Sequence, residues 1–172
     1  MIIQINGKTY KHYHIGNERA YEKANPDMFS LQKNWAKEHI KEEHRIKDSI
    51  VTTMSANKYN EKQSRAMSAH IDSGDYPEGL STMAVFKDGD YSGAYLTFPQ
   101  YGVAVDIPDN TCALFDSQVM HGVTPIRGEG TRYSITAYTD TRLATIGAAG
   151  KSERPIGHHN KDKRGSLEEF IT

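Results

Sequence analysis

Seven short β-prone segments follow one another between Ile50 and Thr139, with no helical pattern between them. Turns rich in Gly, Asp and Pro separate them, for example at residues 88–90, 108–110 and 127–130. Strands at this even spacing are typical of sandwiches and jelly-roll barrels. The sequence therefore predicts a mainly β chain built as a sandwich or a jelly-roll barrel. In sequence letters, the segments are IVTTM, RAMSAHI, LSTMAVF, AYLTF, VAVDI, CALF and TRYSITAYT.

The region before these strands contains a hairpin pattern and one helical pattern. Asn6-Gly7 lies between the alternating pieces IIQI and KTYKHYH, which predicts a β-hairpin. Asn25-Pro26-Asp27 is typical of a helix start, and helix formers continue from Met28 to about Lys47. We therefore expect one domain over residues 1–172, mainly β with flanking helices. Its parts are a supporting hairpin and helix (1–48), the jelly-roll core (49–140) and a C-terminal tail (141–172).

Composition narrows the class of protein. A chain of 172 residues is long enough for a hydrophobic core of its own, and its single cysteine excludes an internal disulfide. No apolar run approaches the roughly 20 residues that span a bilayer, and the N-terminus lacks a signal-peptide pattern. We therefore expect a soluble, cytoplasmic protein with no membrane partner. Its oligomeric state cannot be predicted from the sequence.

Charge is unevenly distributed along the chain, although the formal net charge is only −1. Residues 1–65 carry 12 Lys and Arg against 8 Asp and Glu, whereas residues 66–150 carry 4 against 10. Basic flanks permit contacts with phosphates without requiring them. Ordinary solvated surfaces explain the same pattern equally well.

His70 and Asp72 are separated by one residue in SAHIDSGD, where a β segment runs into a glycine turn. On a strand two such side chains share a face, so the pair could bind one ion. With 8 histidines and 22 acidic residues in the chain, one such pair is also expected by chance. Taken alone, the pair is weak evidence for a metal site.

A second histidine and an arginine change this interpretation. His121 follows about fifty residues later, and Arg132 opens the last β segment with Ser134 two residues further on the same face. Two histidines and one carboxylate form the facial triad of non-haem Fe(II) oxygenases. Such a triad leaves room for a bidentate 2-oxo acid and dioxygen. The guanidinium fork of an arginine suits the far carboxylate of 2-oxoglutarate.

With these residues in this order, the chain resembles the 2-oxoglutarate/Fe(II)-dependent dioxygenases. Within that superfamily it is most similar to the TET/JBP branch, which oxidises nucleobases, and to its small phage and bacterial members. The resemblance covers about Ile50 to Tyr138 and includes the blocks YSGAYLTFPQYGVAVDIPDN and LFDSQVMHGVTPI. Two departures are Ala94, where the family often has a second glycine, and Pro108-Asp109-Asn110 in place of a Pro-Gly-Asp turn.

The resemblance implies a double-stranded β-helix (a cupin-like jelly roll) and a catalytic site. In it, His70, Asp72 and His121 ligate Fe(II), while Arg132 and Ser134 bind 2-oxoglutarate. It further implies that 2-oxoglutarate is oxidatively decarboxylated with O2 and that a substrate C–H bond is hydroxylated, with ascorbate as reductant in vitro. Asp72 favours hydroxylation, because halogenating relatives lack this carboxylate.

The implied substrate is the 5-methyl group of thymine or 5-methylcytosine in DNA, met as a flipped or single-stranded base. Three alternatives stay open: the same chemistry on a free small molecule or a peptide side chain, a zinc hydrolase with the same ligands, and a ligand-binding jelly roll without catalysis. Polar and aromatic residues near the predicted metal site are candidates for substrate contact, namely Asn57, Arg65, Asp75, Tyr76, Tyr95 and Tyr101.

Overall fold

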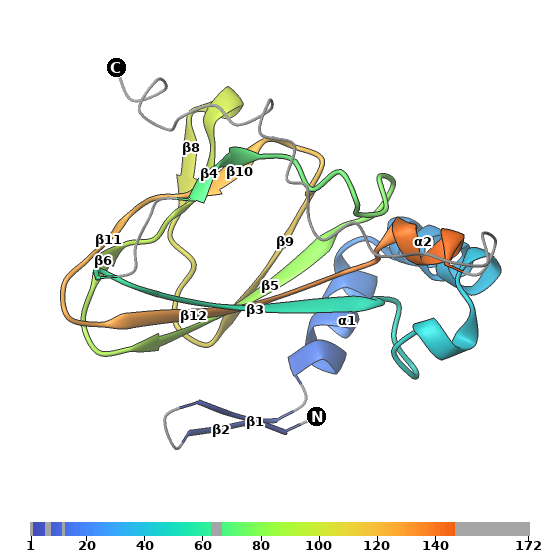
Figure 1. Ribbon diagram of the computed structural model, residues 1–172, viewed down its shortest axis with the longest axis horizontal. Helices are drawn as coiled ribbons and strands as arrows, with labels where there is room; N and C mark the ends of the chain where they lie inside the picture. The colour runs from blue at the N-terminus through green and yellow to red at the C-terminus, as the bar shows by residue number, and fades with distance from the viewer. Residues whose placement is uncertain (1, 6–7, 12, 63–66, 147–172) are drawn as a thin grey trace.

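The computed structural model describes residues 2–5, 8–11, 13–62 and 67–146. Two four-stranded antiparallel sheets face each other (Figure 1). The larger sheet has the order β3-β12-β5-β9, with β3 at Thr53–Asn60, β12 at Thr131–Tyr138, β5 at Ser81–Asp88 and β9 at Thr111–Phe115. The smaller sheet has the order β4-β10-β7-β8, with β4 at Met67–His70, β10 at His121–Val123, β7 at Leu96–Phe98 and β8 at Val103–Val105.

A short two-stranded ribbon forms the bend between the sheets. The chain leaves β5 for the smaller sheet through β6 (Ser92–Gly93) and returns to β12 through β11 (Ile126–Arg127), and β6 pairs with β11. Alternation between two facing sheets in this way is a double-stranded β-helix, so the predicted fold is confirmed. The bend restricts the backbone: Gly93 has a φ of 80°, and a Cβ there would lie 2.1 Å from the Pro125 carbonyl oxygen.

Ala94 follows in the same left-handed region, with a φ of 56°. That conformation favours glycine, because a Cβ crowds the backbone there. The family's second glycine at this position therefore has a conformational reason, which alanine tolerates at a cost of about 1 kcal/mol. In the other departure the left-handed residue is Asn110, with a φ of 57° in the turn before β9, and asparagine adopts that conformation more readily than most residues.

The register of the larger sheet decides which side chains face the interior. β12 pairs with β3 on one side and β5 on the other, with Arg132 opposite Tyr59 and Lys87, and Ser134 opposite Asn57 and Val85. Neighbours in register share a face. Val85 packs between the sheets with Leu96 and Phe115, so this is the inner face and Arg132 points into the barrel.

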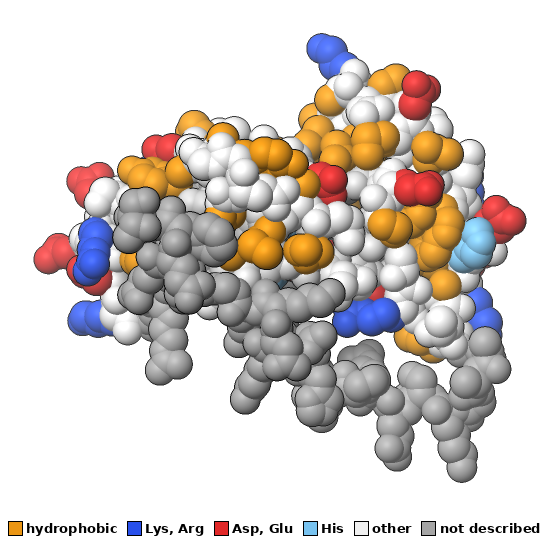
Figure 2. Space-filling view, turned by 90° about the horizontal axis from the view of Figure 1, so that it is seen from above, with side chains coloured by type: hydrophobic (Ala, Val, Ile, Leu, Met, Phe, Trp, Pro, Cys, Tyr) orange, Lys and Arg blue, Asp and Glu red, His pale blue; other side chains and the backbone are white. Residues whose placement is uncertain are grey.

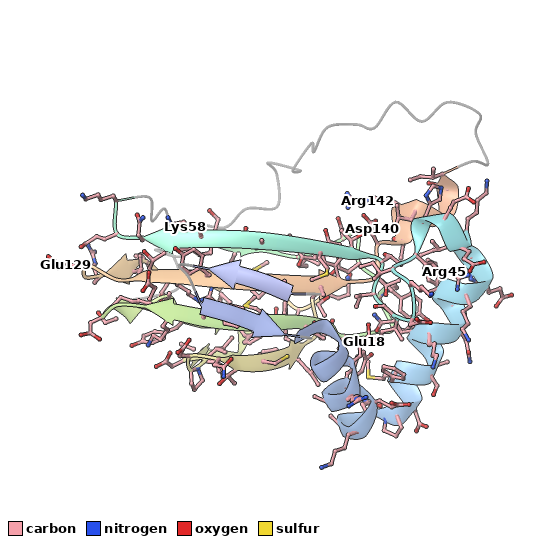
Figure 3. All side chains as sticks on the ribbon, turned by 90° about the horizontal axis from the view of Figure 1, so that it is seen from below. Glu18, Arg45, Lys58, Glu129, Asp140 and Arg142 are labelled. Atoms are coloured by element: carbon pink, nitrogen blue, oxygen red, sulfur yellow. The ribbon has the colours of Figure 1, made fainter. Side chains whose placement is uncertain are left out.

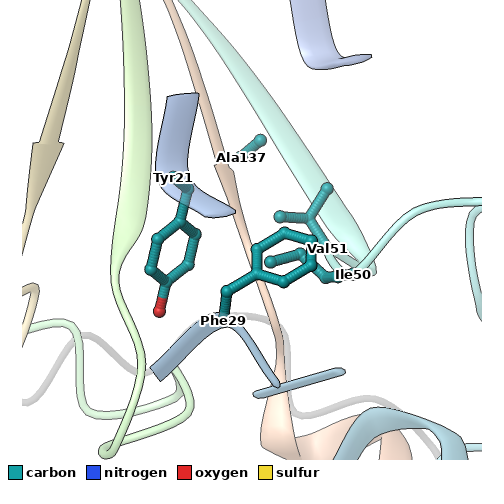
Figure 4. Close-up of a cluster of buried hydrophobic side chains, with 5 residues drawn as sticks. All are labelled: Tyr21, Phe29, Ile50, Val51 and Ala137. Atoms are coloured by element: carbon teal, nitrogen blue, oxygen red, sulfur yellow. The ribbon is translucent and has the colours of Figure 1, made fainter. Parts of the chain in front are cut away.

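Helices cover one end of the opposite, outer face. There, Ala137 of β12 packs against Ile50 and Val51, against Tyr21 of α1 (Tyr13–Ala24) and against Phe29 of α2 (Pro26–His39), as Figure 4 shows. The hairpin of β1 (Ile2–Ile5) and β2 (Lys8–Lys11) lies across the same face of the sheet (Figure 3). Among the described residues, no helix is both long and apolar enough to cross a membrane.

The helix predicted from Met28 to about Lys47 is present but ends earlier, because α2 covers Pro26–His39. A second helix, α1, precedes it and replaces the end of the strand expected to run through Tyr13. α2 starts where predicted, because the Asn25 side chain accepts a hydrogen bond from the Met28 N–H. It ends at His39, because Ile40 turns to extended backbone and is buried; a short 3-10 helix, η1 (Glu42–His44), follows.

Strand boundaries also differ from the sequence prediction. The segment IVTTM was expected to be a strand, but Ile50 and Val51 precede β3 and serve as core residues under the helices. β3 instead continues to Asn60, because its whole length pairs with β12. Of the predicted tail, residues 141–145 form a short 3-10 helix, η3, and residues 147–172 lie outside the described part.

A buried glutamine ties α2 to the end of β12. Gln32 is 1% exposed; it accepts a hydrogen bond from the Tyr21 hydroxyl at 2.9 Å and donates one to Thr139 Oγ1 at 2.8 Å. The Leu80 N–H donates to the same Gln32 oxygen at 3.2 Å, and the Thr139 hydroxyl donates to the Ile50 carbonyl at 2.8 Å. The helices are thus attached to the sheet by polar contacts as well as by the apolar cluster.

We therefore expect Gln32→Leu, which keeps a similar volume, to destabilise the chain by about 2–3 kcal/mol, because three buried polar groups lose a partner. Urea denaturation followed by circular dichroism measures this. Gln100→Leu on the exposed η2 turn (Pro99–Tyr101) is the matched control and should change stability little. Equal stability of the two variants would contradict a structural role for the Gln32 network.

Candidate metal centre

Strand pairing brings the two predicted histidines together. His70 is the last residue of β4 and His121 the first of β10, and the two face each other in the antiparallel register. Asp72 lies two residues beyond β4, where its N–H donates to the Ser117 carbonyl at 3.0 Å. That bond holds the loop after β4 against the segment before β10. Three residues from two distant parts of the sequence therefore meet at one edge of the smaller sheet.

The three side chains point to a common centre. Asp72 Oδ1 lies 3.3 Å from His70 Nε2, and Asp72 Oδ2 lies 3.5 Å from His121 Nε2. One potential ligand atom from each residue falls within 4.8 Å of the others. Two imidazole nitrogens and a carboxylate oxygen in this arrangement can hold a divalent transition-metal ion. Among the described residues, no other cluster of three metal-ligating side chains is found.

Backbone contacts orient both imidazole rings for metal binding. His70 Nδ1 lies 2.8 Å from the Ser68 carbonyl, and His121 Nδ1 lies 2.9 Å from the Val119 carbonyl. Because a carbonyl only accepts hydrogen bonds, each Nδ1 must carry the proton. Each Nε2 therefore faces the centre, where it donates to Asp72 while it carries a proton and offers its lone pair to a metal ion that displaces that proton. Such an outer hydrogen bond, which sets the tautomer and the ring orientation, is the usual support of a metal-ligating histidine.

The three side chains of the centre differ in their exposure to solvent. The His121 side chain is only 4% exposed and packs against the edge of Phe115, whereas His70 and Asp72 are 29% and 33% exposed. The centre is therefore closed on the His121 side and open to solvent on the other. Burial would raise the pKa of Asp72, but hydrogen bonds with His121 and His70 outweigh it and hold that pKa below its usual range. The carboxylate is thus ionised and ready to ligate a cation.

Arg132 lies inside the barrel without an acidic partner among the described residues. Its side chain is buried, its NH2 donates to Met83 Sδ at 3.3 Å, and its NH1 has no hydrogen-bond partner there. Burial lowers the pKa of the guanidinium. A buried charge with an unused donor costs several kcal/mol unless an anion binds it. This position fits the carboxylate of a ligand, and the buried Ser134 lies two residues along on the same face.

The other predicted contact residues lie in different places. Asn57 is half-buried on the inner face opposite Ser134, and Tyr95 is half-buried beside β10, exchanging hydrogen bonds with Thr124. Tyr101 is 63% exposed at the tip before β8. Arg65 lies outside the described residues. Their roles in substrate binding stay predictions.

Asp75 and Tyr76 line a cleft of about 490 Å³ beside the loop that carries Asp72. Asp75 is buried and accepts a hydrogen bond from Ser81 Oγ at 2.8 Å, and burial raises its pKa to about 6. The Tyr76 ring packs against Trp35 of α2 at 4.9 Å. Trp35 also lines the cleft, and five further residues from the loop and from the segments before β10 and after β12 complete the lining: Ser73, Pro77, Glu78, Gln118 and Thr141.

Gln118 supports the loop between β4 and β5 that carries Asp72 (residues 71–80, the metal loop), and no sequence pattern predicted this role. Its Nε2 donates to the Asp72 carbonyl at 3.0 Å and lies 3.5 Å from the Asp75 carbonyl. Nothing local in the sequence marks this role, because the acceptors are backbone atoms more than forty residues away. The position of Gln118 three residues before His121, in the block LFDSQVMH, is the only available sequence clue.

Oxygenases that use Fe(II) and 2-oxoglutarate combine a double-stranded β-helix with two histidines, a carboxylate and an arginine. The fold and the site together therefore place the chain in that class. Within it, the chain belongs to the Tet_JBP family, whose model, the oxygenase domain of the 2OGFeDO superfamily, matches residues 17–141. The residues fit the iron and 2-oxoglutarate that the superfamily implies: the triad offers the N and O donors of an iron site, and Arg132 offers a buried, unused donor to a carboxylate.

Named relatives agree with this class. The chain is 29% identical over 109 residues to thymine dioxygenase JBP1 of Trypanosoma brucei brucei and to the same protein of strain 927/4 GUTat10.1. The match covers 63% of this chain but only 12% of the relative. Among solved structures, NgTET1 in complex with 5mC DNA aligns with a TM-score of 0.58 at 14% identity, over 76% of this chain and 51% of NgTET1. At that identity the likeness supports the fold alone.

We expect Asp72→Asn to weaken divalent metal binding by at least about 100-fold, because a charged ligand is replaced by a neutral amide. Titration calorimetry with Mn²⁺ measures the affinity. Asp106→Asn, an exposed acid outside the triad, removes the same charge and should bind Mn²⁺ like the unchanged protein. Equal affinities of the two variants would exclude Asp72 as a ligand.

Replacing Gln118 tests the support of the metal loop. Gln118→Leu removes the donor to the Asp72 carbonyl at nearly constant volume, and we expect about a 10-fold weaker Mn²⁺ affinity with an unchanged circular dichroism spectrum. Gln100→Leu is the control. An unchanged affinity in Gln118→Leu would show that the loop holds its position without this contact.

Proposed function

We propose that this chain is an Fe(II)- and 2-oxoglutarate-dependent dioxygenase that hydroxylates the 5-methyl group of a pyrimidine base, thymine or 5-methylcytosine, in DNA. The observation that carries the proposal is the His70-Asp72-His121 cluster in a barrel that also holds the buried Arg132, whose NH1 has no hydrogen-bond partner among the described residues. Membership of the Tet_JBP family and the names of its relatives, a thymine dioxygenase and a TET protein with 5mC DNA, support the choice of substrate.

In this proposal, His70, Asp72 and His121 hold Fe(II), and Arg132 with Ser134 holds the far carboxylate of 2-oxoglutarate. Together with O2, these groups supply an oxidation in which one oxygen atom enters the substrate C–H bond and the other enters succinate, with release of CO2; ascorbate keeps the iron reduced in vitro. The chain's own residues provide position. The backbone-bonded histidines fix the ligand geometry, and the open side of the centre at His70 and Asp72 admits the substrate.

The cleft beside Asp72 supports a planar polar substrate. Asp75 and Glu78 can accept hydrogen bonds from the N3–H of thymine or the amino group of 5-methylcytosine, while Tyr76 and Trp35 provide aromatic surface. A base reaches such a cleft only when it leaves the duplex or is already single-stranded. Asn57 lies near Ser134 and Tyr95 near β10, so we assign both to the substrate or co-substrate side of the site. Arg65 stays a candidate for substrate contact from its place in the sequence alone.

A second candidate keeps the chemistry and changes the substrate to a free small molecule or a peptide side chain. It is favoured by charge: residues 66–150 carry 4 basic against 10 acidic residues, and Asp75 and Glu78 line the cleft. On the face seen in Figure 2, basic side chains lie mainly near the margins. DNA phosphates need basic partners, so DNA affinity and its salt dependence distinguish the two candidates.

The test is mass spectrometry of nucleosides from DNA incubated with the protein, Fe(II), 2-oxoglutarate, O2 and ascorbate. We expect thymidine or 5-methyldeoxycytidine to gain one oxygen atom, more on single-stranded than on duplex DNA because no base pair must open. Asp72→Asn should abolish the product, and Asp106→Asn should retain it.

Suppose that 2-oxoglutarate is consumed without a modified nucleoside and that no salt-dependent DNA binding is found. This result would favour the second candidate, in which the substrate is a free small molecule or a peptide side chain. Absence of 2-oxoglutarate consumption under every condition, in protein shown to bind Fe(II), would contradict the dioxygenase proposal itself.

A further inference from the structure

Lys87 lies beside Arg132 on the inner face of the larger sheet. The two residues are direct partners in the antiparallel register between β5 and β12. Partners in register project to the same side, and Arg132 reaches the inner-face residue Met83, so Lys87 also projects toward the barrel interior. Lys87 is half-buried, whereas Arg132 is 2% exposed. Two cations from neighbouring strands therefore face the same interior space.

The surroundings hold Lys87 in this direction. Its ammonium lies 4.6 Å from the centre of the Tyr91 ring, and Tyr91 packs on the apolar cluster of Ala94, Val123 and Ile126 at the bend between the sheets. Its backbone N–H donates to Asp109 Oδ1 at 2.7 Å. The charge of Arg132 acts on the same ring, as do the charges of Asp106 and Asp109.

Neither cation has a carboxylate partner in the described part of the chain, where the ion pairs within 4.0 Å involve other residues. Two like charges that face each other in a partly buried space repel, and each also loses hydration. An anion between them offsets both costs. The contact of Lys87 with Tyr91 compensates only in part, because the face of a neutral ring attracts a cation less strongly than a carboxylate does.

We propose that Lys87 is a second carboxylate-recognising residue, which acts beside Arg132 to make the site selective for a 2-oxo acid with a far carboxylate. The inference rests on the proposed function, since it assumes that 2-oxoglutarate occupies the barrel between the metal centre and Arg132. The planar guanidinium of Arg132 can bind both oxygens of the far carboxylate, and the ammonium of Lys87 adds a single positive charge beside it. Lys87 is thus a specificity-determining residue: a 2-oxo acid that ends in a methyl group gains nothing from it.

The experiment compares two probes, 2-oxoglutarate and 2-oxobutyrate, by titration calorimetry on the full chain loaded with Mn²⁺. 2-Oxobutyrate has the metal-binding 2-oxo acid group but no far carboxylate. We expect Lys87→Met to weaken 2-oxoglutarate binding about 5- to 20-fold, the range for a charge-assisted contact at a half-buried position, and to leave 2-oxobutyrate binding unchanged. Lys87→Arg keeps the charge and should stay within about 3-fold of the unchanged protein.

The chain offers a matched control on the other face of the same sheet. Lys58 lies on β3 (Figure 3), with its ammonium 5.7 Å from the Tyr133 ring centre. Lys58→Met therefore removes a cation–π lysine without touching the barrel interior, and we expect both affinities to remain unchanged. If Lys87→Met binds 2-oxoglutarate like Lys58→Met while Arg132→Met loses binding, the role of Lys87 is refuted and the proposed function stands.

A loss of affinity in Lys87→Met that is equal for the two probes would also refute the role, because it would indicate general damage to the site. If Arg132→Met binds 2-oxoglutarate as tightly as the unchanged protein, or the unchanged protein binds none, the proposed function fails and the inference fails with it. Retained selectivity in Lys87→Arg together with lost selectivity in Lys87→Met supports recognition by charge.

Discussion

The pairing of β12 with two neighbours is the interaction on which the rest of the structure depends. β12 lies between β3 and β5 and bonds to both along nearly its whole length. Its inner-facing residues Arg132 and Ser134 point into the barrel, and its outer-facing Ala137 carries the helices. Because side chains alternate along a strand, one register decides both faces. A slip of one residue would bring Ala137 inside and expel Arg132.

The segment directly after β12 connects the helices with the metal loop. Thr139 accepts from Gln32 of α2 through its hydroxyl and from the Tyr76 N–H through its carbonyl. Both the N–H and the hydroxyl of Thr141 donate to the Gly74 carbonyl. Asp140 and Arg142 add a bidentate ion pair. Their labelled side chains lie side by side in Figure 3. The loop that presents Asp72 is therefore held from this segment and from Gln118.

Part of this could be predicted from the sequence. The even spacing of β segments predicted the β-helix, and the order of His70, Asp72, His121 and Arg132 predicted the residues that the structure brings into one barrel. The start of α1 was misassigned because the alternating pattern KTYKHYH continues through Tyr13 and His14, which suits a strand as well as a helix start. The short strands β6, β10 and β11 were missed because two or three residues contain no measurable period. Their pairing comes from the sheets around them.

The order of residues along the chain was enough to identify its chemical groups: two imidazoles, a carboxylate and an arginine in an order that suits iron and a 2-oxo acid. It could do so because ligand chemistry depends on residue type, and strand periodicity places residues two apart on one face. Only the tertiary structure decided what these groups meet. The supports of the site are backbone carbonyls at Ser68 and Val119 and the amide of Gln118, and Lys87 faces Arg132 through a register between distant strands. Such contacts are long-range, so no local pattern encodes them.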